Sequence, residues 1–474
     1  MTLTRRHALQ RMGAAGMSLL LPACGPHPAP SDSNVRKAGA ADGALRLELR
    51  HHVSHGTEGY ALARVRAESR WAGPKRRGND RPDWGDYRLS VFEAGTKTLV
   101  YRTGFDSNLD LQGPSTATQL SVRFPAPVNA VRATIEKRRA ASVFSELWNI
   151  DIDPAGGNID RSAPALPAQV HAILANGDPQ TKVDIAILGD GYQAAEHRKF
   201  IADAKRAAGY LFSVDPFRAR MHDFNVSAVF TPSADSGVTD RYLGVEKNTV
   251  LRCAYGGGNS ERTLAPGDEH ALREAACAVP YDFLLILANA RRYGGSAYFG
   301  GPATIAIDSA AARYLVVHEF AHIIGGLADE YYLPTRSGPT YTGNIEPWNP
   351  NVTLSSAHAK WTMTDTRPAR WNKAEYDRGF ADYVRRYFAL RDARADEAAV
   401  EQLMQAEAGR QAALLAKNRD RRTVGLFEGA HGYAKGVFRS EVDCIMFSLQ
   451  TDYFCGACLT AISSMIDAQC DRIA

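Results

Sequence analysis

Apolar and polar positions alternate along the first third of the chain. Segments 45–50 and 60–69 follow this period of two, and segments 87–95 and 96–105 repeat it on either side of a short turn. Such alternation predicts half-buried β-strands, and the short turn predicts a hairpin. Because no long helical period interrupts the pattern, we expect residues 44–165 to form an N-terminal antiparallel β-sandwich.

The pattern changes in the remainder of the chain, residues 166–474. Continuous apolar runs at 183–192, 224–230 and 281–289 predict buried strands, and helical spacing follows the first of them at 195–213. Strands that alternate with helices predict an α/β layer with a largely parallel sheet. The fold class expected for the whole chain is therefore α+β.

One stretch near 385–422 differs from the rest of this second domain. It is almost free of Gly and Pro and rich in Ala, Arg, Glu and Leu. That composition predicts one or two amphipathic helices inserted into the domain.

The N-terminus predicts export. Arg5 and Arg6 precede a short apolar stretch at 12–21 and then small residues, which is the three-part pattern of a secretory signal and resembles the twin-arginine type. Cys24 follows Leu-Pro-Ala and resembles the acylated cysteine of a lipobox. We expect residues 1–24 to be a signal peptide and Cys24 to anchor the protein to a membrane through a lipid. A plain signal peptide cut nearby remains the alternative.

Two features of the mature chain, a predicted linker and a small net charge, add to this picture. Residues 25–43 are rich in Pro, Ala, Ser and Gly and predict a linker. The formal net charge of +4 falls to near +1 once Arg5, Arg6 and Arg11 are removed, since positions 1–23 hold no acidic residue. A net charge this small gives no indication of a basic surface that would bind nucleic acid. We expect a periplasmic protein, an outer-membrane-anchored lipoprotein or a secreted protein.

Seven cysteines are present, and removal of Cys24 leaves six. An even number in an exported protein favours disulfides. Cys253 and Cys277 are expected to pair with each other, and the four cysteines at 444–470 to staple the C-terminus. A metal-binding or redox use of the Cys455-Gly-Ala-Cys458 motif stays open.

The strongest chemical signal lies in an uninterrupted apolar stretch, Ala310–Ile324, which predicts a helix. His318 and His322 are four residues apart, so they project from one helix face, where two imidazoles can bind one zinc ion. Glu319 lies beside them and can serve as the general base for a water molecule that the zinc activates. This spacing predicts a metal-dependent hydrolase.

The third zinc ligand is expected just beyond the helix. Gly325 and Gly326 follow His322 and predict a left-handed helix cap, after which the chain turns back. With Gly326 as the turn residue, Asp329 falls at the place of the third ligand. Glu330 is the alternative, because it is adjacent and also offers a carboxylate.

The segment HEFAHIIGGLADEYY, residues 318–332, is similar to the signature of the IgA-peptidase family of bacterial zinc metallopeptidases, peptidase family M64, which resembles the metzincins. Further stretches agree with that family: ILGDGYQAAE at 187–196, DPFRARMHDFNVSAVFTPSADSG at 215–237, GLFEGAHGY at 425–433 and DCIMFSLQTDYFCGAC at 443–458.

The resemblance implies a β-domain in front of a metzincin-like catalytic domain. It also implies Zn²⁺ held by His318, His322 and Asp329, with Glu319 as the catalytic base. Met446 resembles the buried methionine of the metzincin turn beneath the metal, and an ordinary core methionine is the alternative.

We therefore expect an exported zinc-dependent endopeptidase that acts on a protein or peptide substrate. The alternative is a cell-surface binding or scaffold lipoprotein with a non-catalytic zinc site. A structural zinc site closes with four protein ligands and needs no base. Three ligands together with Glu319 favour catalysis.

Overall fold

The computed structural model describes residues 43–470 except 55–56, 74–81, 110–116, 258–259, 333–339, 344 and 419–420. The expected signal peptide, Cys24 and nearly all of the expected linker lie outside the described residues. Among the helices of the described part, none is both long and apolar enough to cross a membrane.

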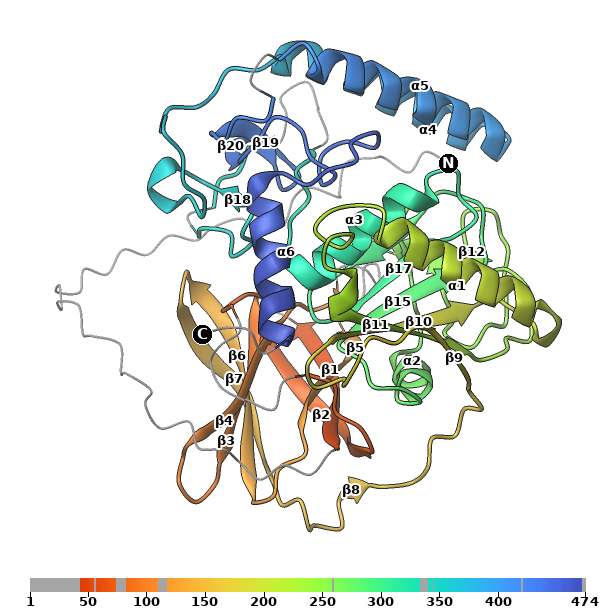
Figure 1. Cartoon of the computed structure of the whole chain (residues 1–474), viewed down its shortest axis with the longest axis vertical. Coiled ribbons are helices and arrows are strands. Elements are labelled where there is room, and N and C mark those ends of the chain that lie inside the picture. Colours follow the sequence, from red (N-terminus) through yellow and green to blue (C-terminus); the bar gives the residue numbers. More distant parts are fainter. Residues whose placement is uncertain are drawn as a thin grey trace.

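Two sheets that share one apolar core make up the N-terminal part of the protein (Figure 1). The predicted hairpin is confirmed, since the strands at 87–93 and 99–105 pair antiparallel. The first sheet has the order β5 (Ala117–Pro125), β1 (Ala44–Ser54), β2 (Thr57–Glu68) and β8 (Ile159–Asp160). The second has the order β4 (Leu99–Phe105), β3 (Tyr87–Glu93), β6 (Val131–Ala140) and β7 (Val143–Ile152). The strands of both sheets are antiparallel except for β8, which pairs with β2 in parallel.

A six-stranded, largely parallel sheet forms the centre of the second part, as the apolar runs predicted. Only its two edge strands, β16 and β9, run antiparallel to their neighbours. The order is β16 (Gly295–Ala297), β17 (Pro302–Ala306), β15 (Phe283–Ala288), β10 (Val183–Asp190), β11 (Phe224–Phe230) and β9 (Gln169–Leu174).

Helices cover both faces of this sheet, which explains why its strands are apolar without alternation. Ile185 and Ile187 of β10 face one core, whereas Ala186 and Leu188 face the other. The first core is completed by α1 (His197–Leu211), α3 (Ala312–Gly325) and α6 (Gly456–Gln469), and the second by α2 (Glu269–Ala276).

Two short three-stranded sheets complete the described strands. One has the order β12 (Thr239–Asp240), β13 (Ala254–Tyr255) and β14 (Leu264–Ala265). The other has the order β18 (Val352–Thr353), β20 (Tyr433–Arg439) and β19 (Phe427–Ala430), and it lies beside α6 in Figure 1.

The two parts of the chain are joined through buried ion pairs. Arg46 of β1 and Arg66 of β2 each donate to the carboxylate of Glu274 on α2, at 2.9 and 3.0 Å. All three side chains are almost completely buried, so removal of one would leave uncompensated charge inside the protein. The N-terminal sheets are therefore packed directly against the second part of the chain.

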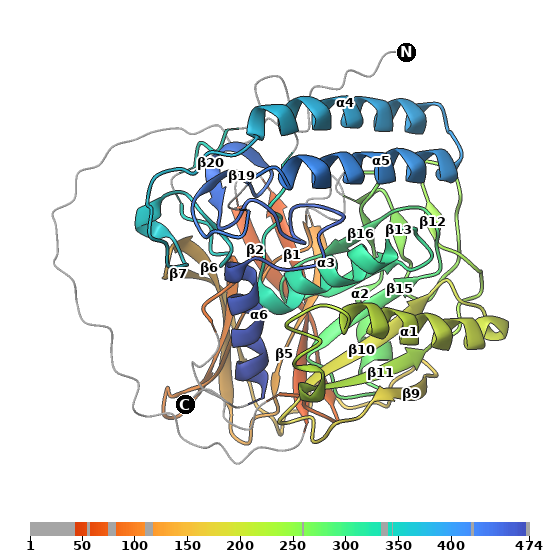
Figure 2. The same ribbon diagram turned by 45° about the horizontal axis from the view of Figure 1, so that its top comes forward.

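The predicted helical segment near 385–422 is a helical hairpin that begins earlier than expected. Its helices, α4 (Lys373–Asp392) and α5 (Glu397–Leu415), lie side by side across one end of the molecule (Figure 2). Gly379 made the first turns of α4 look unlike a helix in the sequence. A β-carbon there would lie 2.2 Å from the guanidinium carbon of Arg410 on α5, so the arginine side chain would have to move.

Candidate metal centre

Helix α3, which packs against β17 of the central sheet and against α6, carries His318, Glu319 and His322. It ends at Gly325, and Gly326 takes the left-handed conformation with φ +58°, as the sequence predicted. A β-carbon on Gly326 would lie 2.8 Å from the ring of Trp348 and 2.9 Å from that of Trp84. The glycine thus allows both the sharp reversal of the chain and the close approach of two indoles.

Three ligand atoms converge where the chain returns past α3. The Nε2 atom of His318 lies 3.0 Å from Oδ1 of Asp329 and 3.2 Å from Nε2 of His322, and the third separation is 3.4 Å. Atoms bound at about 2.0 Å to one tetrahedral ion would be roughly 3.3 Å apart. The two imidazoles and the carboxylate therefore fit a metal of the size and preference of zinc.

Hydrogen bonds to backbone carbonyls fix the orientation of both rings. Nδ1 of His318 donates to the carbonyl of Ile445 at 3.2 Å, and Nδ1 of His322 donates to that of Leu327 at 2.6 Å. With the proton on Nδ1, a neutral imidazole presents the lone pair of Nε2. Both rings are thus held in the tautomer that a metal ligand requires.

The electrostatics of the three side chains favour a cation. Burial lowers the pKa of His322, but the Asp329 carboxylate, Glu319 and the Leu327 carbonyl together raise it, to about 9. Burial acts against ionisation of Asp329, yet His322 and His318 hold its pKa far below the usual range. Asp329 is therefore a carboxylate under all ordinary conditions and attracts positive charge.

Glu319 lies close to the histidines and is almost completely buried. Burial raises the pKa of its carboxyl group, while His318 and His322 act in the opposite direction. Its Oε1 atom lies against edge strand β16, where a β-carbon on Gly295 would approach it to 2.8 Å. A carboxylate with a raised pKa beside a metal-binding set is suited to accept a proton near neutral pH.

The segment after the turn directs its two acidic side chains to different places. Asp329 meets the histidines, whereas Oε1 of Glu330 lies 3.4 and 3.3 Å from the sulfurs of Cys455 and Cys458. Successive side chains of an extended segment point in opposite directions, so both carboxylates cannot reach one ion. Of the two carboxylates that the sequence offered, the structure brings Asp329 and not Glu330 to the histidine pair.

The loop at 444–447 contacts both the segment that carries Glu330 and the ring of His318. The carbonyl of Met446 accepts a hydrogen bond from the backbone N–H of Glu330 at 2.8 Å, next to the Ile445 carbonyl that holds His318. Met446 is completely buried. The loop thus contacts the segment that carries Asp329 and Glu330, while its resemblance to the metzincin turn stays a prediction.

Two supporting residues escaped the sequence analysis. The hydroxyl of Tyr314 lies 3.0 Å from Nδ1 of His318, one helical turn away. That spacing of four was visible in the sequence and could have revealed it. Asn351 bonds to both the N–H and the carbonyl of Ala328, two bonds of 2.9 Å. No local pattern connects Asn351 with residues more than 20 positions earlier.

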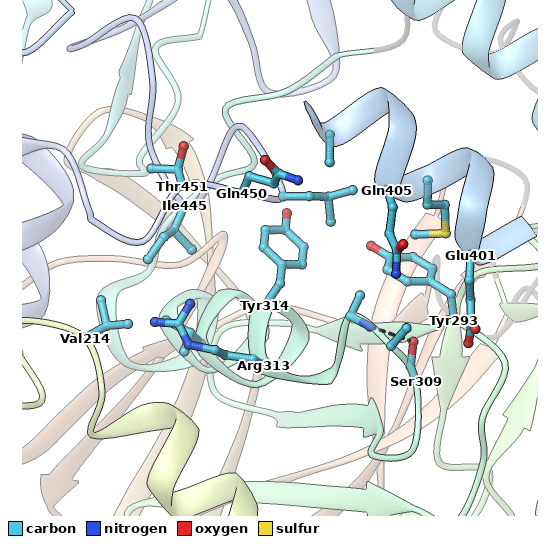
Figure 3. Close-up of a pocket in the computed structure, with 16 residues that line it drawn as sticks. Val214, Tyr293, Ser309, Arg313, Tyr314, Glu401, Gln405, Ile445, Gln450 and Thr451 are labelled. Carbon is cyan, nitrogen blue, oxygen red and sulfur yellow. Dashed lines mark hydrogen bonds between the residues drawn. The ribbon is translucent and has the colours of Figure 1, made fainter. Parts of the chain in front are cut away.

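A cavity of about 260 Å³ adjoins the centre between α3, α5 and the loop at 445–451. In Figure 3 the ring of Tyr314 rises from α3 into this space, below Gln450 and beside Tyr293. Because Tyr314 also contacts His318, the cavity and the histidine pair share a wall. A ligand in the cavity would lie next to the candidate metal centre.

The expected disulfides are absent from the part of the chain that the structure describes. The Cys277 sulfur donates to the carbonyl of Glu274, and Cys253 is buried beside the carboxylate of Asp190, so these two do not pair. Cys444 and Cys458 approach each other, but their sulfurs are 3.8 Å apart, well beyond a covalent bond of about 2.05 Å. The prediction of a disulfide-stapled C-terminus was therefore wrong for this structure.

Comparison with known protein families agrees with the site. Residues 171–466 match the family described as IgA Peptidase M64, and residues 37–149 match the Peptidase M64 N-terminus. No curated protein is significantly similar to the chain. The first match spans the central sheet, α3 and the loop at 444–447, and together the two cover most of the sequence. The chain therefore belongs to the IgA Peptidase M64 family, whose members are peptidases that act on proteins or peptides.

Proposed function

We propose that this peptidase is a zinc-dependent endopeptidase in which His318, His322 and Asp329 hold the ion and Glu319 is the general base. One observation carries the proposal most directly. Three ligand atoms lie 3.0–3.4 Å from one another, and both imidazoles donate their Nδ1 protons to carbonyls of the backbone. That arrangement supports a preformed metal site.

The protein residues have distinct tasks in this proposal. When bound, the zinc ion supplies Lewis acidity that polarises the scissile carbonyl and a water molecule. Glu319 takes the proton from the attacking water and returns it to the leaving amine. Burial, which raises the pKa of the Glu319 carboxyl group, makes it a stronger base than an exposed glutamate. The cavity beside Tyr314 is a candidate for holding one substrate side chain.

The finer fold classification and the location of the protein belong to the same proposal. Two four-stranded sheets around one core support a β-sandwich. A zinc-type helix, its glycine turn and a buried methionine loop support a metzincin-like catalytic domain. The twin-arginine pattern and Cys24 support export, with a lipid anchor in the periplasm or outer membrane.

The rival hypothesis, a scaffold lipoprotein with a non-catalytic zinc, is not favoured by membership of a peptidase family. Glu319 also weighs against it. A structural site has four protein ligands and needs no base, whereas three ligand residues gather here among the described residues, with a buried carboxylate beside them.

Glu319→Gln tests the proposal, because glutamine keeps the shape of the side chain and removes its basicity. We expect unchanged zinc content by elemental analysis and a loss of casein hydrolysis of at least about 10²–10⁴-fold. Glu375→Gln is the matched control. It changes an exposed glutamate on α4, with 53% of its side chain accessible, and should leave both properties unchanged. A Glu319→Gln protein that cleaves casein at more than a tenth of the wild-type rate would refute the role of the base.

A further inference from the structure

A second group of metal-ligating side chains lies on the other side of the segment that carries Asp329. Glu330, Cys444, Cys455 and Cys458 each offer one ligand atom, and the four atoms lie within 4.8 Å of one another. All four residues are completely buried. None of them takes part in the mechanism proposed above.

Three of the six separations within this thiol–carboxylate cluster are close to those expected for one tetrahedral ion, and the other three are within 4.8 Å. The sulfurs of Cys444 and Cys458 are 3.8 Å apart, and Oε1 of Glu330 is 3.4 and 3.3 Å from the sulfurs of Cys455 and Cys458. With zinc–sulfur bonds of about 2.3 Å and zinc–oxygen bonds of about 2.0 Å, a tetrahedron has edges of roughly 3.8 Å between sulfurs and 3.5 Å between sulfur and oxygen.

Only one of the two oxygens of the buried Glu330 carboxylate has hydrogen-bond partners among the described residues. Its Oε1 atom accepts hydrogen bonds from the amide of Asn351 at 3.1 Å and from the thiols of Cys455 and Cys458 at 3.4 and 3.3 Å. Its Oε2 atom is buried and accepts none among the described residues. A buried carboxylate in this condition is costly unless a cation compensates it.

Two of the three sulfurs, those of Cys444 and Cys455, accept hydrogen bonds of the kind that stabilise negative charge. Cys455 is the N-cap residue of α6, where the helix dipole favours an anion, and Cys458 follows one turn later. The backbone N–H of Cys455 donates to the Cys444 sulfur at 3.3 Å, and the hydroxyl of Ser440 donates to the Cys455 sulfur at 3.2 Å. Such hydrogen bonds are typical around thiolates that bind a metal.

We propose that Cys444, Cys455, Cys458 and Glu330 bind a second zinc ion, separate from the candidate catalytic centre. Thiolates select zinc over magnesium or calcium. Four protein ligands close the coordination sphere, so the role of this ion is structural and not catalytic. The proposal does not depend on the peptidase mechanism.

The second ion would also fix parts of the first centre. Glu330 directly follows Asp329, and Cys444 directly precedes Ile445, whose carbonyl orients His318. Holding Glu330 and Cys444 on one ion therefore fixes both the third ligand and the orientation of the first. The two centres are built on opposite sides of the same short segments.

Metal content and cobalt spectroscopy test the proposal. Under reducing conditions, we expect about two zinc ions per wild-type chain and about one in the double variant His318→Ala/His322→Ala. After replacement of zinc by cobalt, the double variant should retain the near-ultraviolet absorption of sulfur-to-cobalt charge transfer. Cys458→Ser should lose that absorption, whereas the matched control Cys277→Ser, outside the cluster, should keep it.

The double histidine variant decides the matter even if Cys458→Ser fails to fold, because its cysteines are intact. Absence of both the remaining ion and the charge-transfer band from that variant would overturn the proposal. Detection by mass spectrometry of a disulfide among Cys444, Cys455 and Cys458 in protein isolated from cells would overturn it as well. Retention of one ion with the thiolate band would establish a second site, whatever the proteolytic activity.

Discussion

Asn351 is the residue whose removal should most clearly separate the support of the metal centre from the metal ligands themselves. Its side chain accepts from the N–H of Ala328 and donates to the carbonyl of Ala328, both at 2.9 Å, and donates to Glu330 at 3.1 Å. Asn351 is completely buried and Ala328 is 4% exposed, so water cannot replace these bonds without rearrangement.

Asn351→Ala would leave one buried N–H and one buried carbonyl of Ala328 without their partner. At about 1–3 kcal/mol for each of these two groups, we expect the free energy of unfolding to fall by about 2–6 kcal/mol. Because Asp329 directly follows Ala328, its position should also loosen. Loss of such outer support weakens metal binding by about 10–100-fold. The assay is competition with a chelator, followed through the loss of casein hydrolysis, alongside urea unfolding.

Asn349→Ala is the matched control for this experiment. The side chain of Asn349 lies in the same loop, is also buried, and donates one hydrogen bond of 2.9 Å to the carbonyl of Gly326. We expect a loss of about 1–2 kcal/mol and little change in metal affinity. If the two variants have equal zinc affinities and equal stabilities, the argument that Asn351 positions Asp329 is wrong.

Two further perturbations have sharp outcomes. Gly295→Ala places a methyl group 2.8 Å from Oε1 of Glu319 and should displace that carboxylate. We expect casein hydrolysis to fall by about 100-fold while zinc content stays unchanged. Normal hydrolysis would contradict the placement of the base. Burial and Asp282 raise the pKa of the Asp184 carboxyl group to about 8, so the folded state retains a proton that the unfolded chain loses near pH 4. The stability that this proton contributes is complete below pH 4 and is lost as the pH rises through 8. Asp184→Asn should therefore gain thermal stability over the wild type between about pH 5 and 8, by at most about 1.4 kcal/mol per pH unit. Asp365→Asn is the control. Hydrogen bonds from Arg367 lower the pKa of the Asp365 carboxyl group to about 2, so this variant should show no gain in stability between about pH 5 and 8.

The strands and the metal helix could be predicted because their signals are local. The apolar run at 224–230 coincides with β11, and the predicted helix at 310–324 differs from α3 by two residues at its start and one at its end. Strand order could not be predicted. β1 pairs with β2 and with the distant β5, because burial of a shared core and not sequence proximity decides the partner.

The supporting residues of the centre were hidden for the same reason. His318, Glu319 and His322 follow from helical spacing alone. Asn351 and the carbonyl of Ile445 act through bonds that span 23 and 127 positions of the chain. The prediction of disulfides failed because it rested on an even number of cysteines. Their number does not reveal that Cys444, Cys455 and Cys458 gather around the carboxylate of Glu330.

The Asp329–Glu330 dipeptide explains why the third ligand could not be settled from spacing. Its register depends on which of two glycines takes the left-handed turn, and in the structure Gly326 does so. A shift by one residue would direct Glu330 to the histidines and Asp329 to the cysteines, since successive side chains alternate. Each carboxylate would then face the wrong set of partners. The backbone bonds from Glu330 to Met446 and from His431 to the carbonyl of Asp329 hold the observed register. The placement of Asp329 at the histidines and the placement of Glu330 at the cysteines therefore require the same register of the segment.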